Sequence, residues 1–203
     1  TLMVSIGELS GRNVAALLSD MNQPLGVEVG NALEMKEAIL TLKGEGPEDF
    51  VEHCLEVASE MLLLGKRAET KSGAREMAIK AISSGEGLVY LRKLIEAQGG
   101  DVSYVDHPEK LPIAPIKAIV EAPKAGNVAE VHARTVGETS VVLGAGRMKK
   151  GDPIDLAVGI SVLVKVGQSV EAGQPMFIIH ARKAEDVEPA RKALLGADRK
   201  SVV

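Results

Sequence analysis

The sequence predicts a mixed fold, α/β in its first half and α+β in its second. Residues 24–98 contain four helical patterns in succession, and a proline-rich crossing follows at 101–115. The remaining residues are rich in short apolar runs separated by glycine turns. A domain boundary is therefore expected near residue 112, which divides the chain into domains at 1–112 and 113–203.

The chain opens on a short helical pattern over residues 1–6, a turn, and then an apolar run. The run from Asn13 to Ser19 lacks polar alternation, as expected for a strand that is covered on both faces. A single strand cannot form a sheet, and a helix that starts at Thr1 has no start signal of its own. We therefore expect further residues upstream, so that the chain is a fragment or a processed chain.

A loop rich in glycine and proline, residues 19–30, precedes the four helices. The first helix is expected over 32–43, because Asn31 and Glu34 have the spacing of a capping box. The other three begin near proline or after glycine and have broad apolar faces. They are expected over 47–64, 71–83 and 86–97.

The second half is expected to alternate short strands with two helices. The strands are predicted over 116–122, within 125–133, and over 158–166 and 175–180. The helices are predicted over 135–143 and 185–195, and a tail over 199–203.

Composition argues against two classes of partner. The net charge is −4 and aromatic residues make up 2% of the chain, which argues against a polyanion-binding surface and against stacking on nucleic-acid bases. The sequence shows no apolar run long enough to span a bilayer and no signal peptide. We expect no nucleic-acid or membrane partner and a cytoplasmic location.

Cysteine and histidine offer no recognisable catalytic or metal-binding pattern. The single cysteine, Cys54, rules out an intrachain disulfide and is interpreted as a small buried hydrophobe. The four histidines are not at metal-ligand spacing and form no recognisable triad with serine or cysteine, so we interpret them as structural or solvated. They are His53, His107, His132 and His180.

A glycine-rich loop, Gly144-Ala-Gly146-Arg147, has two interpretations. Backbone amides in such a loop bind anions, and an arginine could add a bidentate contact. The loop does not have the spacing of a nucleotide-binding fingerprint. A structural turn in which Arg147 pairs with a carboxylate such as Asp155 is the preferred interpretation.

Two glutamates on the first long helix, Glu34 and Glu37, lie three residues apart and so share one helix face. They can be a capping residue and a solvated charge. Alternatively, Glu37 faces back to the preceding loop and, with loop carbonyl oxygens, holds a hard cation. Periodicity alone does not decide between these interpretations.

Residues 166–183 resemble the second half of a biotinyl or lipoyl carrier domain, in which a glycine hairpin leads to a modified lysine. Lys183 lies at about the carrier position. The preceding His180-Ala-Arg differs from carriers, and a helix follows in place of a returning strand. We therefore expect a barrel-sandwich-like hairpin without modification, and we keep a non-enzymatic carrier module centred on Lys183 as the alternative function.

A series of collinear motifs resembles the pyrimidine-nucleoside phosphorylase and thymidine phosphorylase family. The motifs are Asp20–Gly26, Gly30–Glu34, Lys43–Pro47, Ala97–Gly100, Leu143–Arg147, Ile154–Gly159 and the glycine hairpin near 167–174. The resemblance covers the C-terminal half of a family member. It implies the C-terminal part of a large α/β domain, followed by a small β-rich α+β domain.

The resemblance implies reversible phosphorolysis, in which a pyrimidine nucleoside and phosphate give the free base and a pentose 1-phosphate. It also implies a homodimeric parent enzyme. The family's phosphate loop, its Ser-Gly-Arg-Gly signature and its base-binding residues are absent here. No catalytic or substrate-binding residue can therefore be assigned, and the chain alone is expected to be inactive. An AMP phosphorylase-like or anthranilate phosphoribosyltransferase-like parent is a related alternative.

The resemblance also implies half of a potassium site. By position, the cation ligands would be the backbone carbonyls of Leu25 and Glu28 and the carboxylate of Glu37. The remaining ligands would come from the phosphate loop that this chain lacks. The loop Asp20–Gly26 would then support the active-site cleft.

Overall fold

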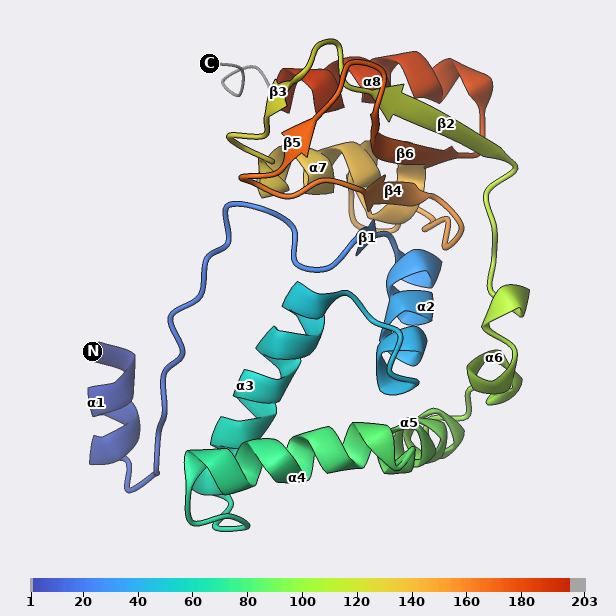
Figure 1. Ribbon diagram of the computed structural model, residues 1–203. Helices are drawn as coiled ribbons and strands as arrows, with labels where there is room; N and C mark the ends of the chain where they lie inside the picture. The colour runs from blue at the N-terminus through green and yellow to red at the C-terminus, as the bar shows by residue number, and fades with distance from the viewer. Residues whose placement is uncertain (1, 198–203) are drawn as a thin grey trace. The chain divides into compact units, whose positions relative to one another are not determined.

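The computed structural model describes residues 2–197, which form two compact units (Figure 1). The helical unit contains residues 2–20 and 41–100, and the sheet unit contains residues 21–40 and 101–197. The domain boundary near residue 112 concerns the longer family fold and stays a prediction. The predicted tail over 199–203 lies outside the described residues.

The helical unit contains α1 (Leu2–Leu9), α3 (Glu48–Leu64), α4 (Lys71–Ser83) and α5 (Glu86–Ala97). The predictions for α3, α4 and α5 are confirmed to within a residue, because each has a clear local start or stop signal. The Thr70 hydroxyl, for example, accepts a 3.1 Å hydrogen bond from the Gly73 N–H and caps α4. Helices α3 and α4 pack against each other and bury Leu55, Ala74 and Ala78.

The strand predicted over 13–19 is wrong. This segment is irregular, Leu18 is fully exposed, and no described residue pairs with the segment in a sheet. An apolar run becomes a strand when a neighbouring strand satisfies its backbone groups, and the described residues supply no such neighbour here. The preceding helix α1 also extends to Leu9, since the single Gly7 does not end it.

The sheet unit contains a four-stranded antiparallel sheet in the order β1-β4-β6-β2. The strands are β1 (Glu28–Val29), β4 (Gly159–Val162), β6 (Pro175–Ala181) and β2 (Ile116–Glu121). A second pair, β3 (Gly126–Asn127) with β5 (Ser169–Val170), is also antiparallel. The strand expected within 125–133 is therefore shorter than predicted, because the chain turns to begin the next helix, which the His132 side chain caps.

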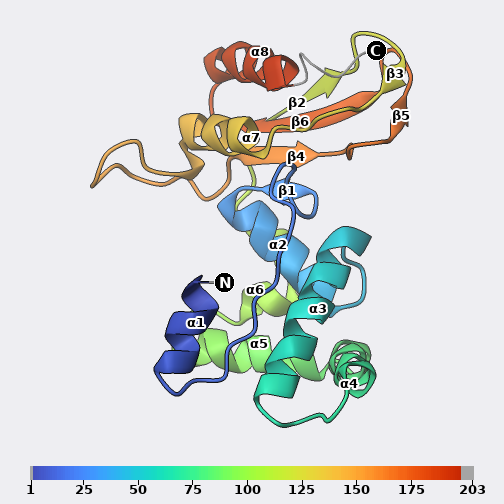
Figure 2. The same ribbon diagram turned by 90° about the vertical axis from the view of Figure 1, so that its left-hand side faces the viewer.

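The remaining helices belong largely to the sheet unit. They are α2 (Asn31–Leu42), α6 (Ser103–Asp106), α7 (Ala133–Ser140) and α8 (Val187–Ala197), with short turns η1 (Pro108–Lys110), η2 (Val141–Ala145) and η3 (Ala184–Asp186). Helices α7 and α8 contact each other and cover one face of the sheet (Figure 2). The core between them includes Val120, Ile160, Ile179, Val136 and Leu194, all fully buried. None of the helices described is both long enough and apolar enough to cross a membrane.

A close backbone crossing between β1 and β4 fixes where residues 24–37 lie. Gly159 has φ +157°, and a Cβ atom added there would overlap the Val29 carbonyl oxygen and lie 3.0 Å from the Gly30 Cα. Only glycine permits this approach without displacing backbone. The crossing brings the end of the glycine-proline loop and the start of α2 onto the edge of the sheet.

We predict that Gly159→Ala destabilises the protein by about 2–4 kcal/mol, because the new methyl group meets rigid backbone atoms and the φ value is unfavourable. The matched control is Gly137→Ala in α7, where no atom lies within 4 Å of the new Cβ. The control should be neutral or stabilising by up to about 1 kcal/mol. Urea unfolding monitored by circular dichroism measures both, and equal effects of the two substitutions would contradict the prediction.

Candidate functional site

The carboxylate of Glu37 lies against the glycine-proline loop. Its side chain is buried, and its Oε1 accepts a 2.8 Å hydrogen bond from the Val27 N–H. Gly26 has φ +69°, and a Cβ atom added there would overlap Glu37 Oε2. Glu37 therefore faces back to the loop, and the interpretation of it as a solvated charge is wrong.

Glu34 caps the start of α2, as the sequence predicts, but the backbone N–H that it binds belongs to Gly30 and not to Asn31. Its Oε1 accepts a 3.0 Å hydrogen bond from the Gly30 N–H. The Asn31 side chain does not complete the capping box, since its Nδ2 donates a 2.7 Å hydrogen bond to the Ala145 carbonyl. The start of α2 is thus attached both to its own loop and to η2 within the sheet unit.

The two proposed carbonyl ligands lie on either side of Gly26 and Val27, in the same loop that Glu37 contacts. Leu25 has a partly exposed side chain, and Glu28 is the first residue of β1. A carboxylate and backbone carbonyl oxygens are the types of ligand that a hard cation uses. The residue types present therefore fit a hard cation.

A lysine that the sequence analysis did not single out also contacts this loop. Lys165 follows β4, and its Nζ donates hydrogen bonds to the carbonyl oxygens of Pro24, at 2.8 Å, and Gly26, at 2.5 Å. The loop is also held by a 2.7 Å hydrogen bond from the Val162 N–H to the Val27 carbonyl. No sequence signal connects residues about 140 positions apart, so these contacts could not be predicted.

Three polar side chains, one each from β1, β4 and β6, form a hydrogen-bonded network across the sheet. The Ser161 hydroxyl donates a 2.6 Å hydrogen bond to Glu28 Oε2 and lies 2.9 Å from His180 Nε2. Because the hydroxyl donates to the carboxylate, it accepts from the histidine N–H. The histidine is then a donor and not a base toward the serine, so the network is structural and does not form a nucleophile triad.

Burial shifts the acid–base properties of this network. Desolvation raises the pKa of Glu28 above its usual value, although the hydrogen bond from Ser161 and the charges of Lys36 and Lys117 oppose this. Desolvation, followed by the positive charge of Lys117, lowers the pKa of His180. Folding therefore favours the neutral form of His180 relative to the unfolded chain.

The other histidines have separate roles. His107 Nδ1 lies 3.1 Å from Glu109 Oε1, and His132 Nδ1 accepts from the Thr135 N–H at the start of α7. His53 lies on α3 and is half-buried. Among the described residues, no group of three or more His, Cys, Asp or Glu side chains is placed to hold a metal ion.

The glycine-rich loop near residue 146 has a structural role that differs from the predicted pairing. The Asp155 carboxylate pairs with Arg182 at 2.7 and 2.9 Å, and this hydrogen bond lowers the pKa of Asp155. Arg147 instead donates a 3.1 Å hydrogen bond from Nε to the Asp152 carbonyl. The expected pair between Arg147 and Asp155 is therefore wrong, because Arg182 at the end of β6 occupies the Asp155 carboxylate.

The lysine at the suggested carrier position is not presented on a hairpin. Lys183 follows β6 and precedes η3, and its Nζ lies 3.4 Å from Glu185 Oε1. The chain then continues into α8. The carrier alternative gains no support from this arrangement.

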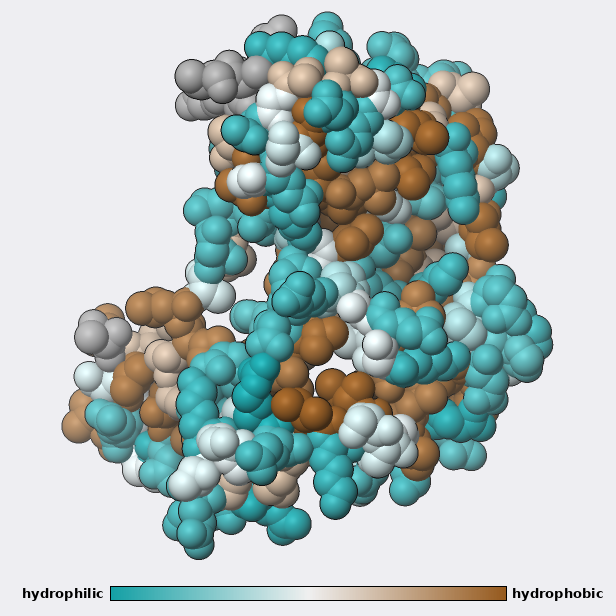
Figure 3. Space-filling model, in the orientation of Figure 1, coloured by the Kyte–Doolittle hydropathy of each residue, from teal (hydrophilic) through white to brown (hydrophobic). Residues whose placement is uncertain are grey.

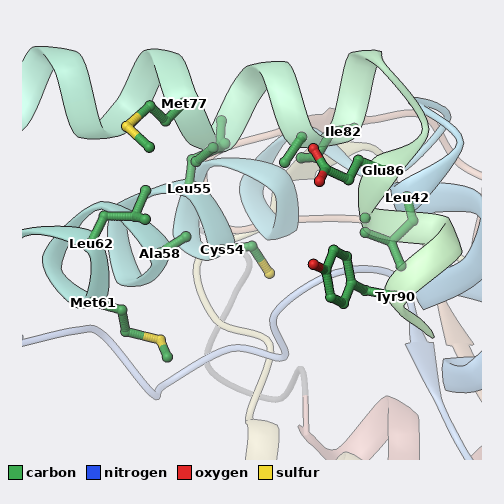
Figure 4. A pocket seen from close by; sticks show the side chains of 13 residues that line it. Leu42, Cys54, Leu55, Ala58, Met61, Leu62, Met77, Ile82, Glu86 and Tyr90 are labelled. Carbon is green, nitrogen blue, oxygen red and sulfur yellow. The ribbon is translucent and has the colours of Figure 1, made fainter. Parts of the chain in front are cut away.

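The helical unit contains an apolar groove of about 540 Å³ between α3, α4 and α5. Figure 4 shows Met61, Met77 and Tyr90 around it, and Figure 3 shows apolar side chains gathered on this part of the surface. Cys54 also lines the groove and is half-buried, so it is less buried than predicted, and desolvation raises the pKa of its thiol. The lining holds few polar groups and so offers little for catalysis.

The chain is similar to known proteins along almost its whole length. Residues 127–198 match the model of the pyrimidine nucleoside phosphorylase C-terminal domain. The chain is 47% identical over 192 residues to the pyrimidine-nucleoside phosphorylases of Staphylococcus aureus strains USA300, N315 and bovine RF122 / ET3-1. The match covers 95% of this chain and 44% of each relative, so the chain spans less than half the length of the curated relatives it matches.

We predict that His180 makes the protein less stable in mild acid. Its pKa is lowered on folding, so the unfolded chain takes up the proton at a higher pH than the folded chain does. Stability is then lost as pH falls below about 6.5. In His180→Gln, the fall in unfolding free energy between about pH 7.5 and pH 5.5 should be smaller than in the original protein.

Urea unfolding at several pH values measures this difference, with His53→Gln as the control that removes a histidine outside the network. The raised pKa of Glu28 acts in the opposite direction, but it is present in both proteins and largely cancels in the comparison. An unchanged pH slope in His180→Gln would contradict the prediction.

Proposed function

We infer that this chain, which belongs to the pyrimidine-nucleoside phosphorylase family, is the C-terminal part of an enzyme that cleaves pyrimidine nucleosides with phosphate. The observation that carries this inference is the continuous similarity over 192 residues to relatives of that name. A phosphate oxygen attacks C1′ of the sugar, and the bond from C1′ to the base nitrogen breaks. The base leaves with the bonding electrons and takes up a proton, which gives the free base and a pentose 1-phosphate.

The chain's own residues would support this reaction without touching the reacting atoms. Catalysis of this kind depends on holding an anion against a carbon that develops positive charge, and on donors that stabilise the leaving base. We assign neither the phosphate-binding nor the base-binding groups to this chain. Its contribution would be the scaffold of the sheet unit and the loop that contains Leu25.

Part of that contribution would be a cation half-site. The carbonyls of Leu25 and Glu28 and the carboxylate of Glu37 would hold potassium, which would place a fixed positive charge beside the phosphate site. The burial of Glu37 against the loop supports this assignment. The remaining ligands would come from the phosphate loop of the family.

The finer features of the family are also part of this proposal. They are a barrel-sandwich-like hairpin near residues 167–174, a homodimeric enzyme and a cytoplasmic location. We further propose that the rest of the α/β domain covers the apolar groove of the helical unit. More than half of each matched relative lies outside the match and is available for this role.

We predict that the 203-residue chain alone does not cleave uridine or thymidine in the presence of phosphate. A chimera in which this chain replaces the matching residues of a Staphylococcus aureus relative should cleave pyrimidine nucleosides. Release of the free base, followed by chromatography, measures both, with the unmodified relative as the positive control. Turnover by the chain alone would contradict the placement of the catalytic groups, and a folded but inactive chimera would contradict the proposed function.

In the same chimera, we predict that Glu37→Gln raises the potassium concentration needed for half-maximal activity by about tenfold, equivalent to about 1.4 kcal/mol. The amide can still accept the hydrogen bond from the Val27 N–H, so the loop should keep its shape while the charge is lost. Glu45→Gln, at an exposed position after α2, is the control. An identical potassium response in Glu37→Gln would remove Glu37 from the site.

A further inference from the structure

The ammonium group of Lys165 bonds to two carbonyls of the loop that contains the proposed cation ligands. Its Nζ donates to the Pro24 and Gly26 carbonyl oxygens, at 2.8 and 2.5 Å. The next backbone N–H, that of Val166, donates a 3.0 Å hydrogen bond to Gln23 Oε1. Lys165 and Val166, which follow β4, therefore both hold the first part of this loop through hydrogen bonds. The hydrogen bonds of Lys165 come from a charged ammonium group.

The two carbonyl groups that accept from Lys165 lie on either side of the Leu25 carbonyl, which is assigned to the cation. Pro24 and Gly26 lie directly before and after Leu25 in the chain. An ammonium group carries three donors on a compact charge, so a single lysine can hold two carbonyls at once. Fixing the peptides on both sides of Leu25 restricts the direction in which the Leu25 carbonyl can point.

The same lysine bonds to a residue, Gly26, that also lies against the buried Glu37 carboxylate. Gly26 accepts from Lys165 through its carbonyl, and its Cα faces Glu37 Oε2, as the position of an added Cβ shows. Burying a carboxylate is costly unless hydrogen bonds and nearby positive charge compensate for the lost water. The Val27 N–H donates directly to Glu37, and the Lys165 ammonium places a positive charge at the carbonyl of the neighbouring Gly26.

We propose that Lys165 is a positioning residue for the cation-binding loop. Its ammonium fixes the backbone of residues 24–26 so that the Leu25 carbonyl and the Glu37 carboxylate are arranged before a cation binds. Preorganisation of this kind increases affinity because the ordering of the loop is completed before binding. The identity of the cation rests on the proposed function, whereas the ordering of the loop by Lys165 does not.

The test is amide hydrogen exchange, measured by NMR on the 203-residue chain. In Lys165→Met, exchange of the Val27 N–H should become about tenfold faster, because the loop that presents it to Glu37 opens more often. Exchange of the Ile179 N–H in the central strand β6 should stay unchanged. Lys165→Arg should restore most of the protection, since its guanidinium can also donate to both carbonyls.

The matched control is Lys124→Met, which removes an exposed lysine from the sheet unit. Unchanged exchange of Val27 in Lys165→Met would overturn the proposal. Equal acceleration at Val27 and Ile179 would also overturn it, because it would indicate a loss of overall stability in place of local positioning. The proposal would also be overturned if Lys165→Arg failed to restore protection of Val27 and exchange became faster throughout the protein.

A second measurement connects the loop to the cation. In the chimera described above, Lys165→Met should raise the potassium concentration for half-maximal activity by about tenfold and leave the rate at saturating potassium within about twofold. Tighter potassium binding in this variant would overturn the proposal, because it would show that the ammonium competes for the ion's place. An inactive parent chimera would refute the proposed phosphorolysis, and hydrogen exchange at Val27 would then decide the role of Lys165.

Discussion

The buried carboxylate of Glu37 is the constraint on which the candidate site depends. A carboxylate in that position requires donors, and the loop preceding α2 supplies the Val27 N–H at 2.8 Å. Glycine at position 26 suits this arrangement, since its φ is +69° and a side chain there would displace the carboxylate. The conformation of the loop therefore follows from one buried charge and the atoms that compensate for it.

The sheet holds this loop at its edge through contacts that are distant in sequence. β1 pairs with β4 across the close approach at Gly159, and the same stretch of chain continues to Lys165. Ser161, between these two residues, binds the Glu28 carboxylate and joins it to His180. Residues 159–166 thus contact one segment in three ways: through its backbone at Val29, through the Glu28 side chain, and through the carbonyl groups of Pro24 and Gly26.

Local signals predicted the helices well and the site only in part. Helices α3, α4 and α5 were predictable because Pro47 precedes α3 and a glycine lies within two residues after the end of each helix. The strand over 13–19 was wrong because strand formation depends on a partner outside the local sequence. The contacts of Ser161 with Glu28 and of Lys165 with Pro24 join residues 133 and 141 positions apart, so no periodicity could indicate them.

These long-range contacts make the proposed half-site dependent on the folded sheet unit. The unfolded chain cannot bring Glu37, the loop carbonyls and Lys165 together, since strand β4 and its following turn must first pair with β1. A cation that binds only the folded arrangement adds its binding free energy to the stability of that unit. Binding of the proposed ion would therefore be coupled to folding of the sheet unit, and the hydrogen bonds of Lys165 to Pro24 and Gly26 would contribute to both.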